Sequence, residues 1–312
     1  MTIRNFLKLV EIQTKLASLF PFLIGVLFSL SYFKQINWLN TFIFFCGMLV
    51  FDMATTAINN YMDFIKAKDD IYKSNTNIIG QANLDTKRIA FLISMMLIFS
   101  MVVGLVLVYR TGWLMLVMGG VCCFIGIFYT YGPIPLSRMP LGELFSGVTM
   151  GLGIFLMTVY INTYSTMFLY LDLSNWEFQL VGNIKILLAI LWASLPMVFT
   201  IANIMLANNL CDLDEDIKNH RYTLPYYIGR ERGVVLFRVL MFSCYGIVII
   251  GLLLGVYQRP MLITLLTFPI IKKNVSEFSR CQIKSKTFVI SIKSLVVFNV
   301  AQIIGLLISL IV

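Results

Sequence analysis

Two stretches of the sequence begin with the same pattern, Asn-Asn-x-x-Asp, and both continue with further acids. In the first stretch, Asn59 and Asn60 precede Asp63, and the run ends at Asp69 and Asp70. Residues four apart lie on one face of a helix, so Asn59 and Asp63 are expected to project together. The first stretch therefore predicts a small cluster of oxygen donors.

The second stretch repeats this arrangement far along the chain. Asn208 and Asn209 precede Asp212, and Asp216 follows one helical turn later. At this spacing Asn208, Asp212 and Asp216 form one continuous polar stripe. The alternative is that each acid simply faces water beside a loop, as charged residues often do. The repetition of one pattern at two distant places favours a shared function.

Oxygen ligands of this kind suit Mg2+, which usually binds a few carboxylates together with the phosphate groups of a substrate. A diphosphate is too negative to approach these acids unless cations bridge the two. Basic residues stand next to both stretches and are candidates to hold the remaining phosphate oxygens; they are Lys66, Lys68, Lys218 and Arg221. We predict a metal site built from Asp63, Asp212 and Asp216 together with Asp69 or Asp70.

The elements that must position these side chains are membrane-spanning helices. The chain is 59% hydrophobic and 12% charged, with a mean hydropathy of +0.87, which is unlike a soluble domain. A span needs about 20 apolar residues, and the sequence predicts nine: Leu16 to Phe33, Leu39 to Tyr61, Ile89 to Tyr109, Gly112 to Tyr131, Leu144 to Tyr164, Ile186 to Leu206, Val234 to Tyr257, Met261 to Val275 and Thr287 to Val312. The eighth is short and contains Pro269, so a re-entrant segment is its alternative.

The distribution of basic residues predicts the orientation. Cytoplasmic segments carry an excess of Lys and Arg, and nine spans with a cytoplasmic amino terminus put 20 of the 24 basic residues on that side. Both acidic stretches then lie at cytoplasmic mouths, and the carboxyl terminus lies outside, across the cell membrane. The net charge of +9 indicates attraction to anionic lipid headgroups, with no need for a nucleic-acid partner.

The equivalent placement of the two stretches also predicts an internal repeat. Each stretch directly follows a predicted span, the second or the sixth, so the repeat has a length of about four spans. We expect a single all-α transmembrane domain over residues 1–312, made of two pseudo-repeats at roughly 1–140 and 141–312.

Longer runs of sequence add a resemblance to a known family. After Asp216 the chain reads Ile-Lys-Asn-His-Arg-Tyr-Thr-Leu and then Ile-Gly-Arg, while residues 129–136 read Tyr-Thr-Tyr-Gly-Pro-Ile-Pro-Leu and are followed by Leu-Gly-Glu at 141–143. With the two acidic stretches, these runs resemble the UbiA superfamily of intramembrane prenyltransferases. Within it they are most similar to the branch that prenylates 1,4-dihydroxy-2-naphthoate in menaquinone synthesis.

This resemblance implies a fold of nine transmembrane helices around a central cavity, with two Asp-rich cytoplasmic motifs. The first stretch departs from the broad family pattern, because Asn60 replaces an Asp and Ala67 stands where the last carboxylate is expected. Asp69 lies two places further along, which is similar to the naphthoate branch, and leaves Asp69 and Asp70 as alternative ligands.

Four further residues are candidates for the site. Lys15 lies near the place where family members have a basic residue facing the cavity; its alternative is a lysine that reaches the membrane interface. Arg138 is the only basic residue in its loop and could meet an anionic substrate, or could be an ordinary topology charge. Tyr129 and Tyr131 could line the path of a carbocation, although tyrosines are common at membrane interfaces.

The resemblance implies a Mg2+-dependent transfer of a polyprenyl chain from an allylic diphosphate to 1,4-dihydroxy-2-naphthoate, with loss of CO2 and diphosphate. The same motifs leave open a prenyltransferase for another acceptor, such as 4-hydroxybenzoate. An ion-coupled transporter is the rival from another class, because acids within helical bundles also mark ion pathways. Transporter acids tend to lie near mid-membrane, whereas these lie at one mouth, which favours the enzyme. Oligomeric state is left open.

Overall fold

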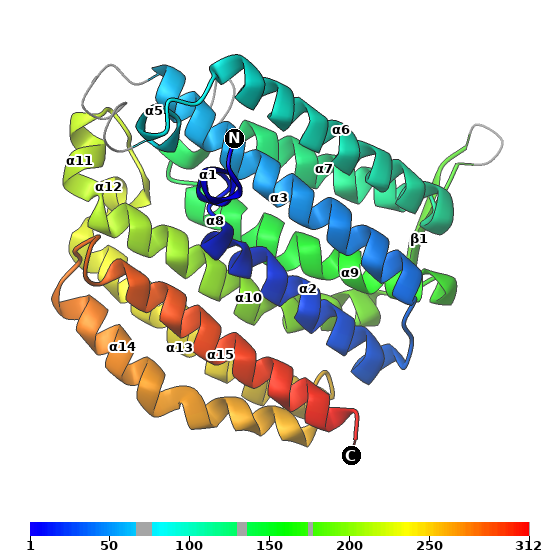
Figure 1. Ribbon diagram of the computed structural model, residues 1–312. Helices are drawn as coiled ribbons and strands as arrows, with labels where there is room; N and C mark the ends of the chain where they lie inside the picture. Colours follow the sequence, from blue (N-terminus) through cyan, green and yellow to red (C-terminus); the bar gives the residue numbers. More distant parts are fainter. Residues whose placement is uncertain (67–76, 130–135, 174–176, 312) are drawn as a thin grey trace.

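The computed structural model describes residues 1–66, 77–129, 136–173 and 177–311. Long helices dominate these residues and run roughly side by side (Figure 1). The main elements are α1 (Ile3–Leu9), η1 (Ile12–Lys15), α2 (Leu16–Phe28), η2 (Ser29–Phe33), α3 (Trp38–Lys66), α5 (Ile78–Gln81), α6 (Thr86–Thr111), α7 (Trp113–Phe128), η3 (Leu136–Arg138), α8 (Gly142–Ser146), η4 (Gly147–Gly153), α9 (Ile154–Thr163), η5 (Tyr164–Thr166), α10 (Ile184–Cys211), α11 (Leu213–Lys218), α12 (Leu224–Ile228), α13 (Arg230–Leu253), η7 (Arg259–Thr267), α14 (Phe268–Arg280) and α15 (Phe288–Ser309).

The prediction of a polytopic helical membrane protein is confirmed. Within the described residues, seven helical segments are long and apolar enough to cross a membrane. The other two predicted spans are also helical but differ from these seven. Helix α7 has only 16 residues. The predicted eighth span consists of the 3-10 helix η7 followed by α14, with Pro269 in the first turn of α14, where its missing N–H costs no hydrogen bond.

The segment formed by η7 and α14 does not fold back on itself. It runs beside α13 and α15 in the bundle (Figure 1). The segment is not among the seven described helical segments that are long and apolar enough to cross a membrane. The sequence did not predict the short antiparallel hairpin of β1 (Leu169–Asp172) and β2 (Gln179–Gly182), which pairs Leu169 with Gly182. The hairpin lies at the far end of the molecule from α11 and α12 (Figure 1).

Close packing of α10 depends on small residues. Gly147 and Gly151 lie one turn apart on the π-helical segment η4, against Val198 of α10. A Cβ atom at Gly151 would lie 2.6 Å from the backbone nitrogen of Val198. Spaced small residues allow membrane helices to approach this closely, because no side chain separates the two backbones.

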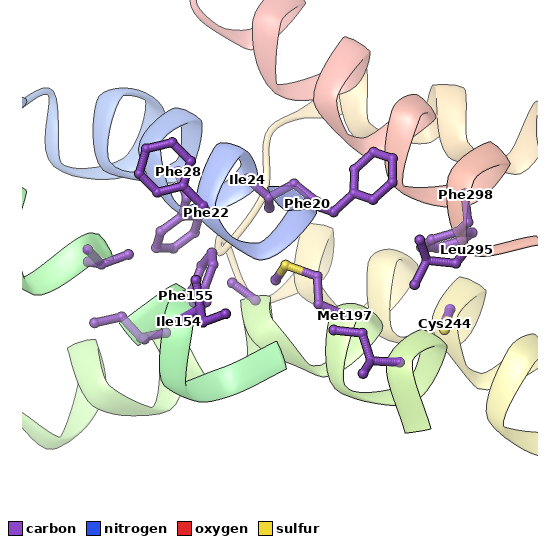
Figure 2. Packing of buried hydrophobic residues seen from close by; sticks show 14 of the residues in the cluster. Phe20, Phe22, Ile24, Phe28, Ile154, Phe155, Met197, Cys244, Leu295 and Phe298 are labelled. Carbon is purple, nitrogen blue, oxygen red and sulfur yellow. The ribbon is translucent and has the colours of Figure 1, made fainter. Parts of the chain in front are cut away.

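The core fills the space between α2, α9, α10, α13 and α15 with apolar side chains. Figure 2 shows Phe22 and Phe28 of α2 beside Phe155 of α9, with Met197 of α10 between them and Phe298 of α15. The lipid-facing surface is apolar as well, since α6 exposes a series of large side chains that includes Phe91, Met95, Ile98, Met101 and Leu105. Helices that are apolar both inside and outside are typical of membrane bundles.

Candidate active site

The two acidic stretches, which we call the first motif (residues 59–70) and the second motif (residues 208–216), lie at the same end of the bundle. Helix α3 carries the first motif near its carboxyl end, and α10 leads into α11 with the second. Helices α5, α11 and α12 and the connection between α14 and α15 also gather at this end (Figure 1). The helices therefore place polar side chains from both halves of the chain at one end.

The second motif has the local geometry that its spacing predicts. Helix α10 ends at Cys211, and Asp212 joins it to α11. The backbone N–H of Asp216 donates to the carbonyl of Asp212 at 2.8 Å, and that of Asp212 donates to the carbonyl of Asn208 at 3.0 Å. Asn208, Asp212 and Asp216 therefore follow one another at single-turn intervals, as predicted.

Asp216 is buried, with 4% of its surface exposed, and it faces a cation. The Nε of Arg221 lies 3.4 Å from Asp216 Oδ1, while Asp216 Oδ2 has no hydrogen-bond partner within the described structure. Burial raises the pKa of the Asp216 carboxyl above its ordinary value, and the positive charge of Arg221 opposes this rise. A buried carboxylate oxygen without a partner is costly, so this atom is available to a ligand.

A buried acid lies beneath the second motif. Glu143, in the first turn of α8, accepts a hydrogen bond from Asn209 Nδ2 at 2.8 Å, and its other oxygen has no partner within the described structure. The Tyr129 hydroxyl donates to the carbonyl of the neighbouring Gly142 at 3.4 Å. In the sequence, Glu143 stood out only as part of the Leu-Gly-Glu run that resembles the family. Its position as an acid at the start of an apolar segment is the signal that could have assigned it to the site.

The first motif is only partly described. Asn59 and Asp63 are half-buried on α3. Asn60 turns toward the amino-terminal segment, because its Nδ2 donates to the Leu9 carbonyl at 2.9 Å and to Glu11 Oε1 at 3.2 Å. Lys66 is the last residue of α3. The predicted site residues Lys68, Asp69, Asp70 and Tyr131 lie outside the described residues.

The remaining cations differ in their surroundings. Lys218 and Arg138 are exposed, and neither forms an ion pair with a described residue. Lys15 is instead buried between α2 and α3, where its Nζ lies 2.7 Å from Asp52 Oδ1. Asp52 was not predicted to take part, although an acid inside a predicted span is itself a signal for a functional or paired group.

The donor set fits Mg2+. Carboxylate and amide oxygens dominate both motifs, and Asp216 Oδ2 has no hydrogen-bond partner in the part of the chain that the structure describes. Within the described ranges, no three His, Cys, Asp or Glu side chains gather closely enough to hold a metal ion. Mg2+ usually binds through a few protein oxygens and completes its coordination with water and phosphate.

Comparisons with known proteins identify the family. Residues 18–273 match the model of the UbiA prenyltransferase family. The Bacillus subtilis 1,4-dihydroxy-2-naphthoate octaprenyltransferase is 28% identical over 244 residues, which cover 77% of this chain and 72% of that protein.

Two solved structures share the fold. The apo structure of a UbiA homologue from Aeropyrum pernix superposes with a TM-score of 0.68 at 13% identity, covering 93% of this chain and 96% of that one. A UbiA homologue from Archaeoglobus fulgidus, solved with DMAPP and Mg2+, gives a TM-score of 0.61 at 12% identity, with coverage of 97% and 99%. The chain therefore belongs to the UbiA prenyltransferase family, as its motifs predicted, and is an enzyme of that family.

Proposed function

We propose that this enzyme transfers a polyprenyl chain from an allylic diphosphate to 1,4-dihydroxy-2-naphthoate, releasing diphosphate and CO2 and forming the quinol of a demethylmenaquinone. The observation that carries the proposal is the mixed charge of the second motif, where buried or half-buried acids alternate with cations at one end of an apolar bundle. The identity with the Bacillus subtilis naphthoate enzyme supports this acceptor, and the Archaeoglobus fulgidus homologue was solved with a prenyl diphosphate.

The acids would hold Mg2+ and the cations would hold phosphate oxygens. Asp63, Asp212 and Asp216, with Asp69 or Asp70, are the metal ligands in this proposal. Bound Mg2+ supplies positive charge that stabilises the departing diphosphate. Lys218 and Arg221 add charge-assisted hydrogen bonds to the same group, which is worth most where charge develops as the allylic C–O bond breaks.

The prenyl chain needs an apolar path away from the motifs. A pocket of about 260 Å³ lies between α7 and the η4–α9 segment, and its lining includes Val121, Ile125, Val148 and Leu152. Ile125 is one helical turn before Tyr129. In our proposal the chain enters this pocket, Tyr129 presents its ring to the allylic cation, and the apolar walls keep water from quenching that cation.

The acceptor carboxylate needs a cation of its own. Lys15 already binds Asp52, whereas Arg138 makes no ion pair with a described residue. We therefore assign Arg138 to the acceptor. The ring carbon bearing the carboxylate attacks the allylic carbon, the new C–C bond forms, and the C–CO2 bond then breaks to return its electron pair to the ring.

A competition assay tests this function. Membranes containing the enzyme receive a polyprenyl diphosphate, Mg2+, and equal amounts of 1,4-dihydroxy-2-naphthoate and 4-hydroxybenzoate, and both products and CO2 are measured. We expect prenylated naphthoquinol and one CO2 for each product molecule. Prenylated 4-hydroxybenzoate that keeps its carboxylate, without any naphthoate product, would refute the acceptor and leave the prenyltransferase activity standing. Arg138→Gln should raise the KM for the acceptor well before it changes diphosphate affinity.

The orientation is part of the proposal. The excess of basic residues near the motifs supports a cytoplasmic position for this end and an outside position for the carboxyl terminus. Single cysteines replacing Lys218 or Arg280 in a cysteine-free background should react with a membrane-impermeant thiol reagent only from the cytoplasmic side. Labelling of the Arg280 position from outside would reverse the placement of the last two helices.

A further inference from the structure

The connection between α14 and α15 reaches into the second motif. Lys284 of this connection donates from its Nζ to Asp212 Oδ2 at 2.6 Å, and also to the side-chain oxygen of Asn208. The same Nζ lies 4.9 Å from the centre of the Phe288 ring. Lys284 could not be assigned to the site from its sequence position, because it is one of six basic residues in a single predicted cytoplasmic segment. In the folded chain Lys284 contacts Asp212, which lies 72 residues earlier in the sequence.

The connection is a defined turn that presents this lysine. The Ile283 backbone N–H donates to Thr287 Oγ1 at 2.9 Å, and the Thr287 N–H donates back to the Ile283 carbonyl at 2.8 Å. Gln282 Nε2 ties the start of the turn to the Phe278 carbonyl at 2.6 Å. Backbone and side-chain bonds therefore fix both sides of Lys284, while its own side chain stays 47% exposed and is free to change partners.

The ammonium group lies on the oxygen atoms that the motif offers to a metal ion. A monovalent and a divalent cation on one carboxylate repel each other strongly at contact distance, so Mg2+ that binds Asp212 displaces Lys284 from it. The displaced ammonium is still tethered beside the motif. The nearest new source of negative charge is then the diphosphate that arrives with the metal ion.

We propose that Lys284 is a diphosphate-binding residue that occupies the second motif until substrate arrives. Without ligand it pairs with the charge of Asp212 and donates a hydrogen bond to Asn208. With Mg2+ and prenyl diphosphate bound, it moves from the carboxylate to a phosphate oxygen. This inference rests on the proposed function only in that the ligand is a diphosphate bound with Mg2+, and it adds the α14–α15 connection to the elements that bind it.

The proposal predicts two effects of opposite sign. Removing the ammonium in Lys284→Gln removes the competitor of Mg2+, so Mg2+ alone should bind about three- to tenfold more tightly. The same change removes a charge-assisted bond to phosphate, so a prenyl diphosphate should bind about three- to tenfold more weakly at saturating Mg2+. Both ranges correspond to one partly exposed charged hydrogen bond. A lysine that only stabilises the turn would not move the two affinities in opposite directions.

Calorimetric titration of the purified full-length enzyme in detergent measures both affinities. The first titrant is MgCl2 alone, and the second is geranyl S-thiolodiphosphate, a diphosphate that ionises slowly, at saturating Mg2+. Lys286→Gln is the matched control, since it removes the same charge two residues away in the same turn and should leave both affinities near those of the unaltered enzyme. Lys284→Arg should retain diphosphate binding.

The outcomes separate this inference from the function beneath it. Tighter Mg2+ binding with weaker diphosphate binding in Lys284→Gln alone supports it. Weakening of both affinities, no change in either, or an equal effect of Lys286→Gln would overturn it, because each indicates a structural or a diffuse electrostatic role. Failure of the unaltered enzyme to bind the thiolodiphosphate with Mg2+ would instead refute the proposed function itself.

Discussion

Asp52 is the residue whose replacement should harm the fold most. It lies in the middle of α3, inside an apolar span, and meets Lys15 from the start of the first span. Lys15 Nζ donates to Asp52 Oδ1 at 2.7 Å, to the Asp52 carbonyl at 3.1 Å and to Thr56 Oγ1 at 2.6 Å. Ser18 Oγ donates to the other carboxylate oxygen at 2.6 Å. Asp52→Ala removes the only negative charge in this group and leaves the ammonium buried.

The size of the effect follows from the burial of the pair. The side chains of Lys15 and Asp52 are 6% and 15% exposed, so water compensates little of the lost interaction. Breaking a buried pair by removing one partner costs about 3–5 kcal/mol, mostly because the remaining charge is uncompensated. At roughly 2–4 °C for each kcal/mol in chains of 150–250 residues, Asp52→Ala should lower the Tm by on the order of 10 °C.

The measurement is the fraction of detergent-purified enzyme that stays monodisperse after heating. The matched variant is Lys15→Met with Asp52→Leu, which removes both charges and should recover most of the lost stability, since apolar replacement of a buried pair is often neutral. A Tm of Asp52→Ala within 2–3 °C of that of the unaltered enzyme, a margin of about 1 kcal/mol, would contradict this account. A double variant no more stable than the single variant would contradict it as well. The double variant also tests Lys15 as a site residue, because a raised acceptor KM at permissive temperature would give it a role in binding.

Three further predictions follow from the site and its packing. Asp63→Asn and Asp212→Asn should each lower turnover by about 100-fold or more, because each removes charge from a proposed metal ligand. Size-exclusion profiles check the fold, and near-normal turnover in either variant would show that the replaced residue is not a metal ligand. Gly151→Ala should lower the free energy of unfolding by about 1–3 kcal/mol through overpacking, since its Cβ would meet the backbone of α10. A Cβ added at Gly119 would meet no atom within 4 Å, so Gly119→Ala should leave the Tm unchanged or raise it. Mg2+ affinity should fall as the pH drops through the raised pKa of Asp216, because the proton then competes with the metal ion. Calorimetry over a series of decreasing pH values measures this, and a slope unchanged by Asp216→Asn would rule out Asp216 as its source.

Local spacing explains what could be predicted from the sequence. The spans follow from apolar runs, which need no knowledge of their neighbours, and the stripe of Asn208, Asp212 and Asp216 follows from helical periodicity alone. The motif resemblance was enough to identify the family, which the family model confirms. Features that depend only on residue type and local spacing can therefore be predicted without knowing how the chain folds.

Pairings between distant segments could not be predicted in this way. Lys15 with Asp52 and Lys284 with Asp212 are separated by 37 and 72 residues, and several basic residues near each acid were equally good partners in the sequence. The hairpin of β1 and β2 was missed because its strands have only four residues each, which is too few for an alternating pattern to stand out.

The charge balance of the second motif suggests how it can bind a highly charged ligand at modest cost. Each of its three aspartates already has a cation, since Lys284 pairs with Asp212, Arg230 with Asp214 and Arg221 with Asp216. A metal ion together with a diphosphate brings opposite charges that largely cancel. In the mechanism we propose, binding proceeds by exchange, with Asp212 and Asp216 turning to the metal ion while Lys284 and Arg221 turn to phosphate. Lys284 and Arg221 exchange one anionic partner for another in this process, which lowers the desolvation penalty that opposes buried ions. A purely acidic site would bind the metal ion but repel the diphosphate, and the cations from α14–α15 and from the segment after α11 remove that repulsion.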